Sequence, residues 1–551
     1  MSDSYDWRRG GIIYQVYPRS FKSSGNGATG DLRGITEKLP YIKSLGVDAV
    51  WLSPFFKSPM KDYGYDVSDY NDVDPMFGTL DDFDSLIEKA HGLDLKIIVD
   101  MILCHSSDQH EWFKESRSSR DNPKNDWYVW ADPKKDGSPP NNWQSVFGGA
   151  SWTFSVERGQ YYFHNFLREQ PHINLFSSGA RQAVLDATRF WLDRGVDGIR
   201  LDAAAHYFYD PKLRDNPYNN QLPPYKPNMY SATPYMMQLH KNDTSQKDSL
   251  VFVEEIRMLL DEYEGRVAIG ELGGQRGLQM SALYTSGPKR LHTAYNFSLI
   301  TGDEPSAERI KKSLKGFERY SKESWPSWAF SNHDSIRVAS RWHYNKNGFH
   351  HDPRLSKCLN AALFALRGTL FLYQGEELGL PEVEIPYALL QDPFGKNIWP
   401  MPGRDGCRTP MPWNKEAPHG GFTKGDRVWL PVGDEHLKLA VDIQEKDAAS
   451  TLNFTRAVSQ WRKDNPALVS GDIHFLKTPH DKVLGFVRSH KAQKIICLFN
   501  MSAEPAQMPL PSLGGMKGDV FDAGQQTGVA NGKILNLPAY GIYMLSSALP
   551  G

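Results

Sequence analysis

The chain has 551 residues, of which 40% are hydrophobic and 12% aromatic, so a large folded core built from more than one domain is expected. Lys and Arg total 63 against 65 Asp and Glu, and the formal charge of -2 provides no positive field for nucleic acid or an anionic membrane. We therefore predict neither a nucleic-acid partner nor a membrane partner.

The N-terminal segment MSDSYDWRRGG lacks the apolar run and the small-residue cleavage site of a signal peptide, and no later stretch has the roughly 18 apolar residues of a membrane helix. The four cysteines, Cys104, Cys358, Cys407 and Cys497, are widely spaced and form no Cys-x-x-Cys pair. This pattern indicates free thiols in a reducing compartment, and the cytoplasm is the expected location.

Eight short runs of β-branched and aromatic residues alternate with segments of helical period, a pattern typical of strands joined by helical crossovers. The predicted strands are 12–21, 49–55, 95–103, 196–202, 266–272, 293–297, 328–334 and 369–375. Predicted helices between them include 31–46, 80–92, 178–195 and 307–321. Eight strands with helical connections favour a closed parallel (β/α) TIM barrel over an open doubly wound sheet.

Three connections are too long for plain loops: 104–175, the Pro/Asn-rich segment 210–234, and about 379–430. From about residue 470 the sequence changes to short alternating runs separated by turns, which indicates an antiparallel β domain. We predict a catalytic barrel in two parts, 1–103 and 176–469, interrupted by an inserted domain, 104–175. A C-terminal β-sandwich domain, 470–551, follows.

Acidic and basic side chains stand where the predicted strands end, which is where a barrel of this type places its active site. Asp100 and His105 end or follow the third strand, Arg200 and Asp202 end the fourth, and Glu271 ends the fifth. His333 and Asp334 end the seventh. The barrel is expected to bring these groups together.

Arg200 lies two residues before Asp202, and residues so spaced on a strand point the same way, so the guanidinium can hold Asp202 ionised. Asp202 is therefore the candidate nucleophile. Glu271 has no neighbouring cation in the sequence and is the candidate for the raised pKa of a general acid. Retaining glycosidases use such a set of acids, although metal-dependent hydrolysis could also use three acids.

The motifs at these positions resemble glycoside hydrolase family 13, the α-amylase family, and within it the α-glucosidase and oligo-1,6-glucosidase branch. The resemblance covers nearly all of the chain and rests on eight blocks in the order of the family. They are IIYQVYPRSF at 12–21, YGYDVSDY at 63–70, DMILCH at 100–105, GIRLD at 198–202, IGEL at 269–272, SNHD at 331–334, YQGEELG at 373–379 and GRDGCRTPMPW at 403–413.

The resemblance implies that Asp202 is the nucleophile that forms a glucosyl-enzyme. It implies that Glu271 is the acid/base and that Asp334 stabilises the transition state. It also implies a glucose pocket in which the substrate is held by His105, Arg200 and His333, with Tyr65 as the stacking platform.

Asp62 and Arg404 resemble the pair that clamps the non-reducing end of the substrate in this branch. An ion pair across the pocket floor would close it, so that one glucose is removed at a time, whereas the alternative is an ordinary surface salt bridge. Phe147, in NNWQSVFGG, is a further candidate for the pocket wall, with a place in the core as the alternative.

The family's metal sites are altered in this chain. The branch usually carries an acidic calcium- or magnesium-binding loop after the first strand, but Ser23, Gly25 and Gly27 replace three of its oxygen ligands here. Cys104 replaces the Asn that supplies a calcium ligand in α-amylases. We therefore predict no bound metal and no cofactor. His172 replaces the Asp of a QPDLN block, and its role is left open.

These features predict an exo-acting retaining α-glucosidase that acts on a small oligosaccharide or α-glucoside, with transglucosylation as a second outcome of the same intermediate. Ala203 follows the nucleophile where the oligo-1,6-glucosidases carry Val, which favours α-1,4 linkages. One alternative is a glucosyltransferase or isomerase of the same family, of the trehalose synthase or sucrose isomerase type. A remote one is a non-catalytic, membrane-anchored relative associated with transporters. The oligomeric state is left open.

Overall fold

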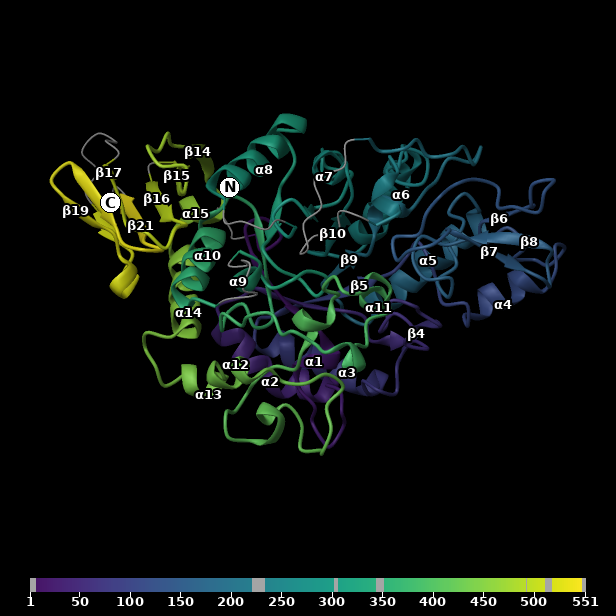
Figure 1. Ribbon diagram of the computed structural model, residues 1–551, viewed down its shortest axis with the longest axis horizontal. Helices are drawn as coiled ribbons and strands as arrows, with labels where there is room; N and C mark the ends of the chain where they lie inside the picture. The colour runs from purple at the N-terminus through teal and green to yellow at the C-terminus, as the bar shows by residue number, and fades with distance from the viewer. Residues whose placement is uncertain are drawn as a thin grey trace.

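A parallel barrel forms the centre of the molecule (Figure 1). The computed structural model describes residues 6–220, 233–301, 306–342, 351–491, 493–510 and 518–547. All eight predicted barrel strands are present, each within or close to its predicted range. They are β1 (Ile12–Val16), β2 (Ala49–Leu52), β5 (Lys96–Met101), β9 (Gly198–Leu201), β10 (Val267–Leu272), β11 (Thr293–Asn296), β12 (Ser327–Ala329) and β13 (Thr369–Tyr373).

The strand order is β11-β10-β9-β5-β2-β1-β13-β12, and every neighbouring pair is parallel. A parallel bridge between Ala294 and Pro326 lies where the edge strands β11 and β12 approach each other, so the sheet is nearly closed. The predicted TIM barrel is confirmed.

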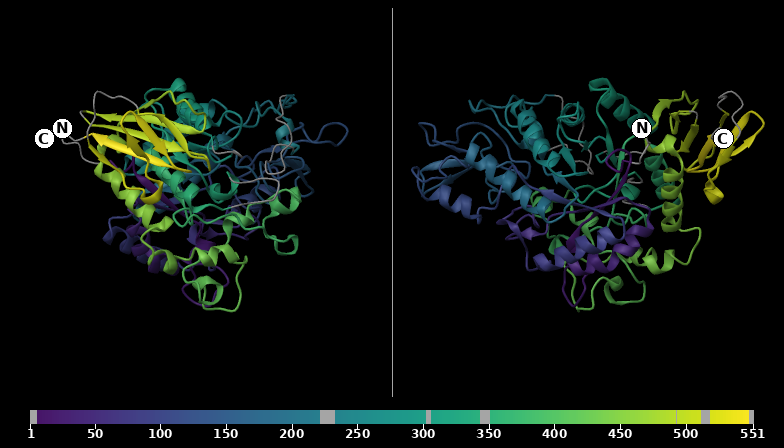
Figure 2. Two further views of the ribbon diagram at one scale, coloured as in Figure 1. Left: turned by 60° about the vertical axis from the view of Figure 1, so that its left-hand side comes forward. Right: turned by 180° about the vertical axis from the view of Figure 1, so that it is seen from behind.

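Helices surround the barrel and follow its strands along the chain (Figures 1 and 2). The longer ones are α2 (Leu32–Ser44), α3 (Leu80–Gly92), α5 (Ser178–Asp193), α6 (Asp248–Asp261), α7 (Gly277–Tyr284), α8 (Ala307–Tyr320), α10 (Pro353–Ala365) and α14 (Thr451–Asp464). Shorter ones are α1 (Pro18–Phe21), α9 (Val338–Arg341), α11 (Pro393–Ile398), α12 (Asp434–Lys438), α13 (Val441–Gln444) and α15 (Pro466–Val469). Local capping fixes several starts: Thr79 and Asp82 form a reciprocal capping box at α3.

Alternation along the strands divides the core into two layers. Side chains such as Ile13, Trp51 and Phe371 fill the barrel interior, together with Ile98 and Ile269. Their neighbours along the strands pack in the larger cluster outside the barrel, against the helices. Side chains along a strand alternate with a period of two. The side chains of Arg200, Asp202 and Glu271 therefore point toward the barrel axis, and they lie beyond the layer of apolar side chains that fills the interior.

The segment after β5 contains a small sheet in the order β6-β8-β7, with β6 (Trp130–Ala131), β7 (Trp152–Ser155) and β8 (Gln160–Phe163), preceded by α4 (Glu111–Ser118). A short hairpin of β3 (Phe56–Lys57) and β4 (Asp69–Val73) comes before β5 in the chain. Trp143, Trp152 and Phe163 form part of a separate aromatic core in the inserted segment. Figures 1 and 2 show this segment at one end of the long axis, opposite the C-terminal strands.

The C-terminal strands form two antiparallel sheets. The first has the order β14-β15-β16-β21-β18, and the second has the order β17-β20-β19. Their bounds are β14 (Asp472–Phe475), β15 (Val483–His490), β16 (Gln493–Asn500), β17 (Ala506–Pro509), β18 (Gly518–Val520), β19 (Val529–Asn531), β20 (Ile534–Leu537) and β21 (Ile542–Ser547). Leu498, Leu535 and Leu537 belong to one apolar cluster shared by both sheets, as in the predicted sandwich.

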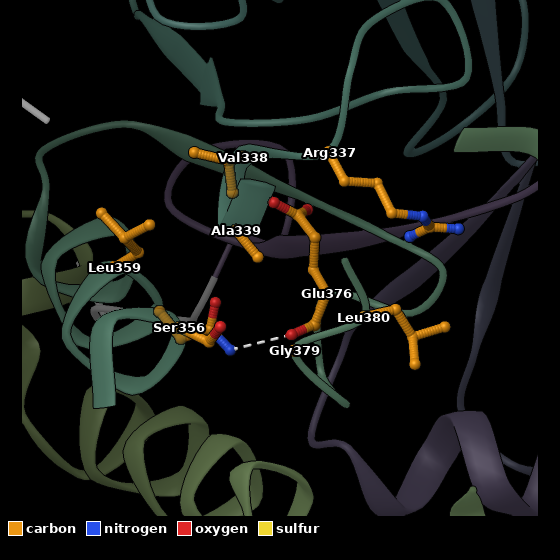
Figure 3. A pocket seen from close by; sticks show the side chains of 9 residues that line it. Arg337, Val338, Ala339, Ser356, Leu359, Glu376, Gly379 and Leu380 are labelled. Atoms are coloured by element: carbon orange, nitrogen blue, oxygen red, sulfur yellow. Dashed lines mark hydrogen bonds between the residues drawn. The ribbon is translucent and has the colours of Figure 1, made fainter. Parts of the chain in front are cut away.

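A small cavity lies beside α9 and α10, next to the loop that follows β13 (Figure 3). Its lining includes Arg337, Ser356 and Glu376, and the side-chain amide of Asn360 donates to the backbone carbonyl of Glu376 at 3.2 Å. Its space of about 10 Å³ suits a single water rather than a sugar, and none of the predicted site residues lines it.

None of the helices in the described ranges combines the length and apolar character needed to cross a bilayer.

Candidate active site

One buried cation joins three of the acids at the strand ends. Nη1 of Arg200 lies 2.6 Å from Oδ1 of Asp100 and 2.6 Å from Oδ1 of Asp202, while Nη2 lies 2.5 Å from Oε2 of Glu271. The register explains this meeting, because Arg200 pairs with Asp100 on β5 and with Ile269 on β10. The barrel therefore brings Asp202 and Glu271 to one guanidinium.

Glu271 has no neighbouring cation along the sequence, but it has one in space. Arg200 contacts Glu271 from the neighbouring strand, a contact that spacing along one strand cannot reveal. The backbone N–H of Ala203 also donates to Oε2 of Glu271 at 2.9 Å. Both carboxyls are equally buried, so they are distinguished by their full set of neighbours and not by Arg200 alone.

Burial raises the pKa of Glu271 to about 8 and the pKa of Asp202 to about 7, although Arg200 opposes both shifts. Burial also raises the pKa of Asp334, but His333, Arg404 and Arg408 outweigh it and hold that pKa below its ordinary range. Near neutrality Glu271 therefore keeps a proton, Asp334 is ionised, and Asp202 can exist as the free carboxylate.

These pKa values predict a narrow bell-shaped pH profile. Asp202, the predicted nucleophile, must be ionised to attack, so kcat/KM is expected to fall as the pH drops through about 7, the pKa of Asp202. Glu271, the predicted general acid, must be protonated, so kcat/KM is also expected to fall as the pH rises through about 8, the pKa of Glu271. Initial rates on p-nitrophenyl α-glucoside between about pH 5 and pH 10 measure both limbs. A profile that stays flat above pH 8 would contradict the assignment of Glu271.

The predicted pair of Asp62 and Arg404 lies within a larger buried network. Nη2 of Arg404 is 2.8 Å from Oδ1 of Asp62 and 2.7 Å from Oδ1 of Asp392, and Nη1 is 3.2 Å from Oδ1 of Asp334. Asp62 and Arg404 are almost entirely inaccessible, so the pair is not an exposed surface salt bridge. Arg408 reaches the same oxygen of Asp334 at 2.8 Å.

His105, Tyr65 and His333 lie in one hydrogen-bonded chain. Oη of Tyr65 is 2.6 Å from Nε2 of His333 and donates to Oδ2 of Asp100 at 3.1 Å. Nε2 of His105 lies 3.0 Å from the backbone carbonyl of Tyr65. The chain fixes the orientation of these rings around the acids.

Phe147 comes from the inserted segment and lies beside Arg404, whose guanidinium carbon is 4.9 Å from the centre of its ring. Phe394 of α11 packs against the same ring at 5.3 Å, and the side-chain amide of Asn397 donates to the backbone carbonyl of Phe147 at 3.1 Å. The inserted segment and the loop after β13 therefore meet at Arg404. Residues 221–232, in the Pro/Asn-rich connection 210–234, lie outside the described ranges.

Sequence reasoning missed several polar residues that support the site. Asp392 fixes Arg404, Arg408 binds Asp334, Tyr295 accepts from Arg200, and Gln170 donates to Asp62. Gln15, on β1, lies 2.6 Å from Nδ1 of His333. Three of these residues could have been found from the sequence, because Gln15 and Tyr295 lie in predicted strands and Arg408 lies in the 403–413 block. Asp392 and Gln170 lie in long connections, where only the folded chain reveals their partners.

The positions that depart from the family pattern have local protein partners. Asp31 caps α2 by accepting from the N–H of Gly34, and its other oxygen accepts from Ser24. The absence of a metal at this loop stays a prediction. Cys104 is buried with Sγ 3.2 Å from Nδ1 of His105. His172 is buried in the inserted segment beside Asn165, with its ring 5.0 Å from that of Phe163.

Comparisons with known proteins agree with this arrangement. Residues 15–471 match the model of the alpha amylase catalytic domain, and residues 473–544 match the maltogenic amylase C-terminal domain. A probable alpha-glucosidase of Rhizobium meliloti (strain 1021) is 49% identical over 94% of this chain and 93% of its own length. An oligo-1,6-glucosidase of Heyndrickxia coagulans is 34% identical over 92% of this chain and 94% of its own length.

Among solved structures, that of the α-glucosyl transfer enzyme XgtA superposes with a TM-score of 0.94 at 47% identity, covering 99% of this chain and 100% of that one. The barrel, the acids at its strand ends and these matches lead to the same assignment. The chain belongs to the α-amylase family, glycoside hydrolase family 13.

Proposed function

We propose that the protein is an exo-acting, retaining α-glucosidase that releases glucose from the non-reducing end of short α-glucosides, with Asp202, Glu271 and Asp334 as its catalytic residues. The observation that carries the proposal is the pairing of an ionisable Asp202 with a protonated Glu271 on one buried guanidinium. The names of the relatives, a probable alpha-glucosidase and an oligo-1,6-glucosidase, support the same activity.

In the proposed reaction, Glu271 donates its proton to the leaving oxygen while Asp202 attacks the anomeric carbon. Esterification removes the charge of Asp202, which contributes to the raised pKa of Glu271. The pKa of Glu271 then falls, and the same carboxylate takes a proton from water. Asp334, kept ionised by its basic neighbours, stabilises the positive charge that develops on the sugar ring.

The contacts of Arg404 support removal of one glucose at a time. Asp62, Asp392 and Asp334 surround its guanidinium, and Phe147 covers one side. In this proposal these groups close the pocket floor, His105, Arg200 and His333 bind the glucose hydroxyls, and Tyr65 stacks on the ring. An endo-acting enzyme would need an open groove at that point.

Glucose release from equal concentrations of maltose, isomaltose and sucrose tests the proposal. We expect the highest kcat/KM on maltose, because Ala203 favours the α-1,4 linkage, and glucose of α configuration as the first product seen by NMR. A higher rate on isomaltose would overturn the linkage preference. The β-anomer as first product would overturn the retaining mechanism.

Replacing Ala203 by Val is expected to raise the ratio of isomaltose to maltose kcat/KM by about tenfold, within the 1–3 kcal/mol that one or two methyl groups in a pocket contribute. The total activity is expected to fall, because Ala203 has φ 44° and a β-branched side chain is strained in this left-handed conformation. The Ala203→Gly variant suits that conformation and serves as the control. The same substrate ratio in all three proteins would contradict a role for this position.

Replacing Asp392 by Asn is expected to lower kcat/KM on maltose by roughly 30-fold, or about 2 kcal/mol, mainly through a higher KM. The buried carboxylate makes hydrogen bonds to Nε, Nη2 and the backbone N–H of Arg404, so its loss frees the guanidinium to turn from the pocket. Steady-state kinetics check this, with the exposed Asp426→Asn as control. An unchanged KM would show that Arg404 holds its position without Asp392.

A second candidate function is transfer of glucose to another hydroxyl compound, favoured by the match to the glucosyl transfer enzyme XgtA. Transfer uses the same glucosyl-enzyme and differs only in the acceptor that Glu271 activates. Product analysis at high maltose concentration separates the two. Mainly free glucose supports hydrolysis, and mainly trisaccharide supports transfer.

We also propose that 104–175 forms a distinct inserted domain and that 470–551 forms a C-terminal domain. One apolar cluster built mainly from 104–175, and another that lies entirely within 470–551, support this division. The near-neutral charge supports action on a small carbohydrate without a nucleic-acid or membrane partner. The four buried, unpaired cysteines support a cytoplasmic location.

A further inference from the structure

Three different metal-binding side chains converge beside the proposed nucleophile. Cys104, His105 and Asp202 each offer one ligand atom, and these atoms lie within 4.8 Å of one another. All three residues are buried, and Asp202 is the most accessible of them, with its side chain 10% exposed. We propose that this cluster is a zinc-binding site, and that an ion bound there inhibits the enzyme reversibly by occupying Asp202.

The donor types favour zinc over calcium or magnesium. Thiolate sulfur, imidazole nitrogen and carboxylate oxygen are the three ligands that zinc takes in proteins, whereas hard cations require mainly oxygen. Sγ of Cys104 already lies 3.2 Å from Nδ1 of His105. Ligand atoms about 3.3 to 3.8 Å apart surround a tetrahedral zinc, so only small shifts are needed.

The hydrogen bonds leave the correct nitrogen of His105 available. Nε2 lies 3.0 Å from the backbone carbonyl of Tyr65, which can only accept, and 3.2 Å from the side-chain nitrogen of Gln170, which donates to Asp62. A ring proton on Nε2 satisfies the carbonyl while Gln170 keeps its bond to Asp62. Nδ1 then presents its lone pair toward Cys104. A metal ion can take the place of the thiol proton in that contact.

The nearby charges are balanced for a divalent cation. Arg200 brings one positive charge, and it occupies Oδ1 of Asp202 while the carboxylate has a second oxygen. Asp100 also contacts Arg200, so a second carboxylate besides Asp202 offsets the charge of the guanidinium. A thiolate at Cys104 and the carboxylate of Asp202 then match the two charges of zinc.

A buried hydroxyl near the cluster lacks a hydrogen-bond partner among the described residues. Oη of Tyr207 is fully buried and has no hydrogen-bond partner within the described ranges. Burial raises the pKa of Tyr207, and so do the neighbouring Cys104 and Asp202. Catalytic-type zinc sites have three protein ligands and a water, and a water on this ion would give Tyr207 a partner.

Zinc binding and activity are measured separately in the purified, metal-free protein. We expect calorimetry to show one zinc ion per chain, and Co²⁺ in place of zinc to give a thiolate charge-transfer absorption. Inhibition of maltose hydrolysis by zinc should be competitive with substrate and fully reversed by a chelator. The Cys104→Ser variant keeps a hydroxyl beside His105 and should bind zinc at least tenfold more weakly without the Co²⁺ band.

The matched control is Cys358→Ser, which changes another buried cysteine, in α10, whose sulfur contacts the backbone carbonyl of Asn500. It should keep the zinc affinity and the Co²⁺ band of the wild type. If Cys104→Ser fails to fold, as judged by circular dichroism, Cys104→Ala replaces it. Equal zinc affinity in the Cys104 variant and the wild type would overturn the proposal, as would a Co²⁺ spectrum without a thiolate band. Because binding is read without turnover, these outcomes do not depend on the glucosidase activity.

Discussion

Replacing Asp202 by Asn is expected to lower kcat on maltose by roughly 10⁴-fold or more, because the amide cannot form the glucosyl ester on which both half-reactions depend. Asn keeps the size of the side chain, and Arg200 can still contact the amide oxygen at the position of Oδ1. The loss should therefore come from chemistry rather than from misfolding. Initial rates, together with a thermal melt, measure the two effects separately.

An external nucleophile distinguishes a missing nucleophile from a damaged site. In the Asp202→Asn variant, azide can enter the space beside the uncharged amide and attack an activated substrate such as α-glucosyl fluoride, so we expect β-glucosyl azide, with inverted configuration. The exposed Asp186→Asn, on α5, is the matched control and should keep wild-type kinetics. Residual activity within about tenfold of the wild type would show that another group is the nucleophile.

The barrel was predictable because its signals are local. Runs such as 95–103 and 369–375 are apolar over the length of a strand, and a helical period separates one run from the next. Thr79 and Asp82 mark a helix start by capping, which also acts over a few residues. Strand ends were less exact: β12 stops at Ala329, so His333 and Asp334 lie in the following loop rather than in the strand.

The meeting of these acids was predictable because each stands at the carboxyl end of a strand or a few residues beyond it, and a parallel barrel collects such ends at one face. Their electrostatics were not. The contact of Arg200 with Glu271 crosses from β9 to β10, and Asp392 reaches Arg404 from a loop whose course depends on packing against Phe147. Such contacts form between segments that are distant in the sequence, so the spacing of residues along the chain cannot predict them.

Replacing Glu271 by Gln is expected to have an effect that depends on the leaving group. Maltose needs a proton on the departing sugar oxygen, so its kcat/KM should fall by roughly 10²- to 10⁴-fold, the usual contribution of a general acid. The leaving group of 2,4-dinitrophenyl α-glucoside departs without a proton, so its first step should change little. The glucosyl-enzyme should then accumulate, because no base activates water, and a burst of dinitrophenol should precede a slow steady state.

The pH profile and azide complete this test. Gln does not titrate, so the alkaline limb near pH 8 that the pKa of Glu271 produces in the wild type should disappear. Azide needs no base, so it should speed turnover of the dinitrophenyl substrate and give α-glucosyl azide, the anomer opposite to that from the Asp202 variant. The exposed Glu264→Gln is the control. An alkaline limb that survives in Glu271→Gln would mean that another group donates the proton. Opposite azide anomers from the two variants would assign the two carboxyls to opposite faces of the same anomeric carbon, as a double-displacement reaction requires.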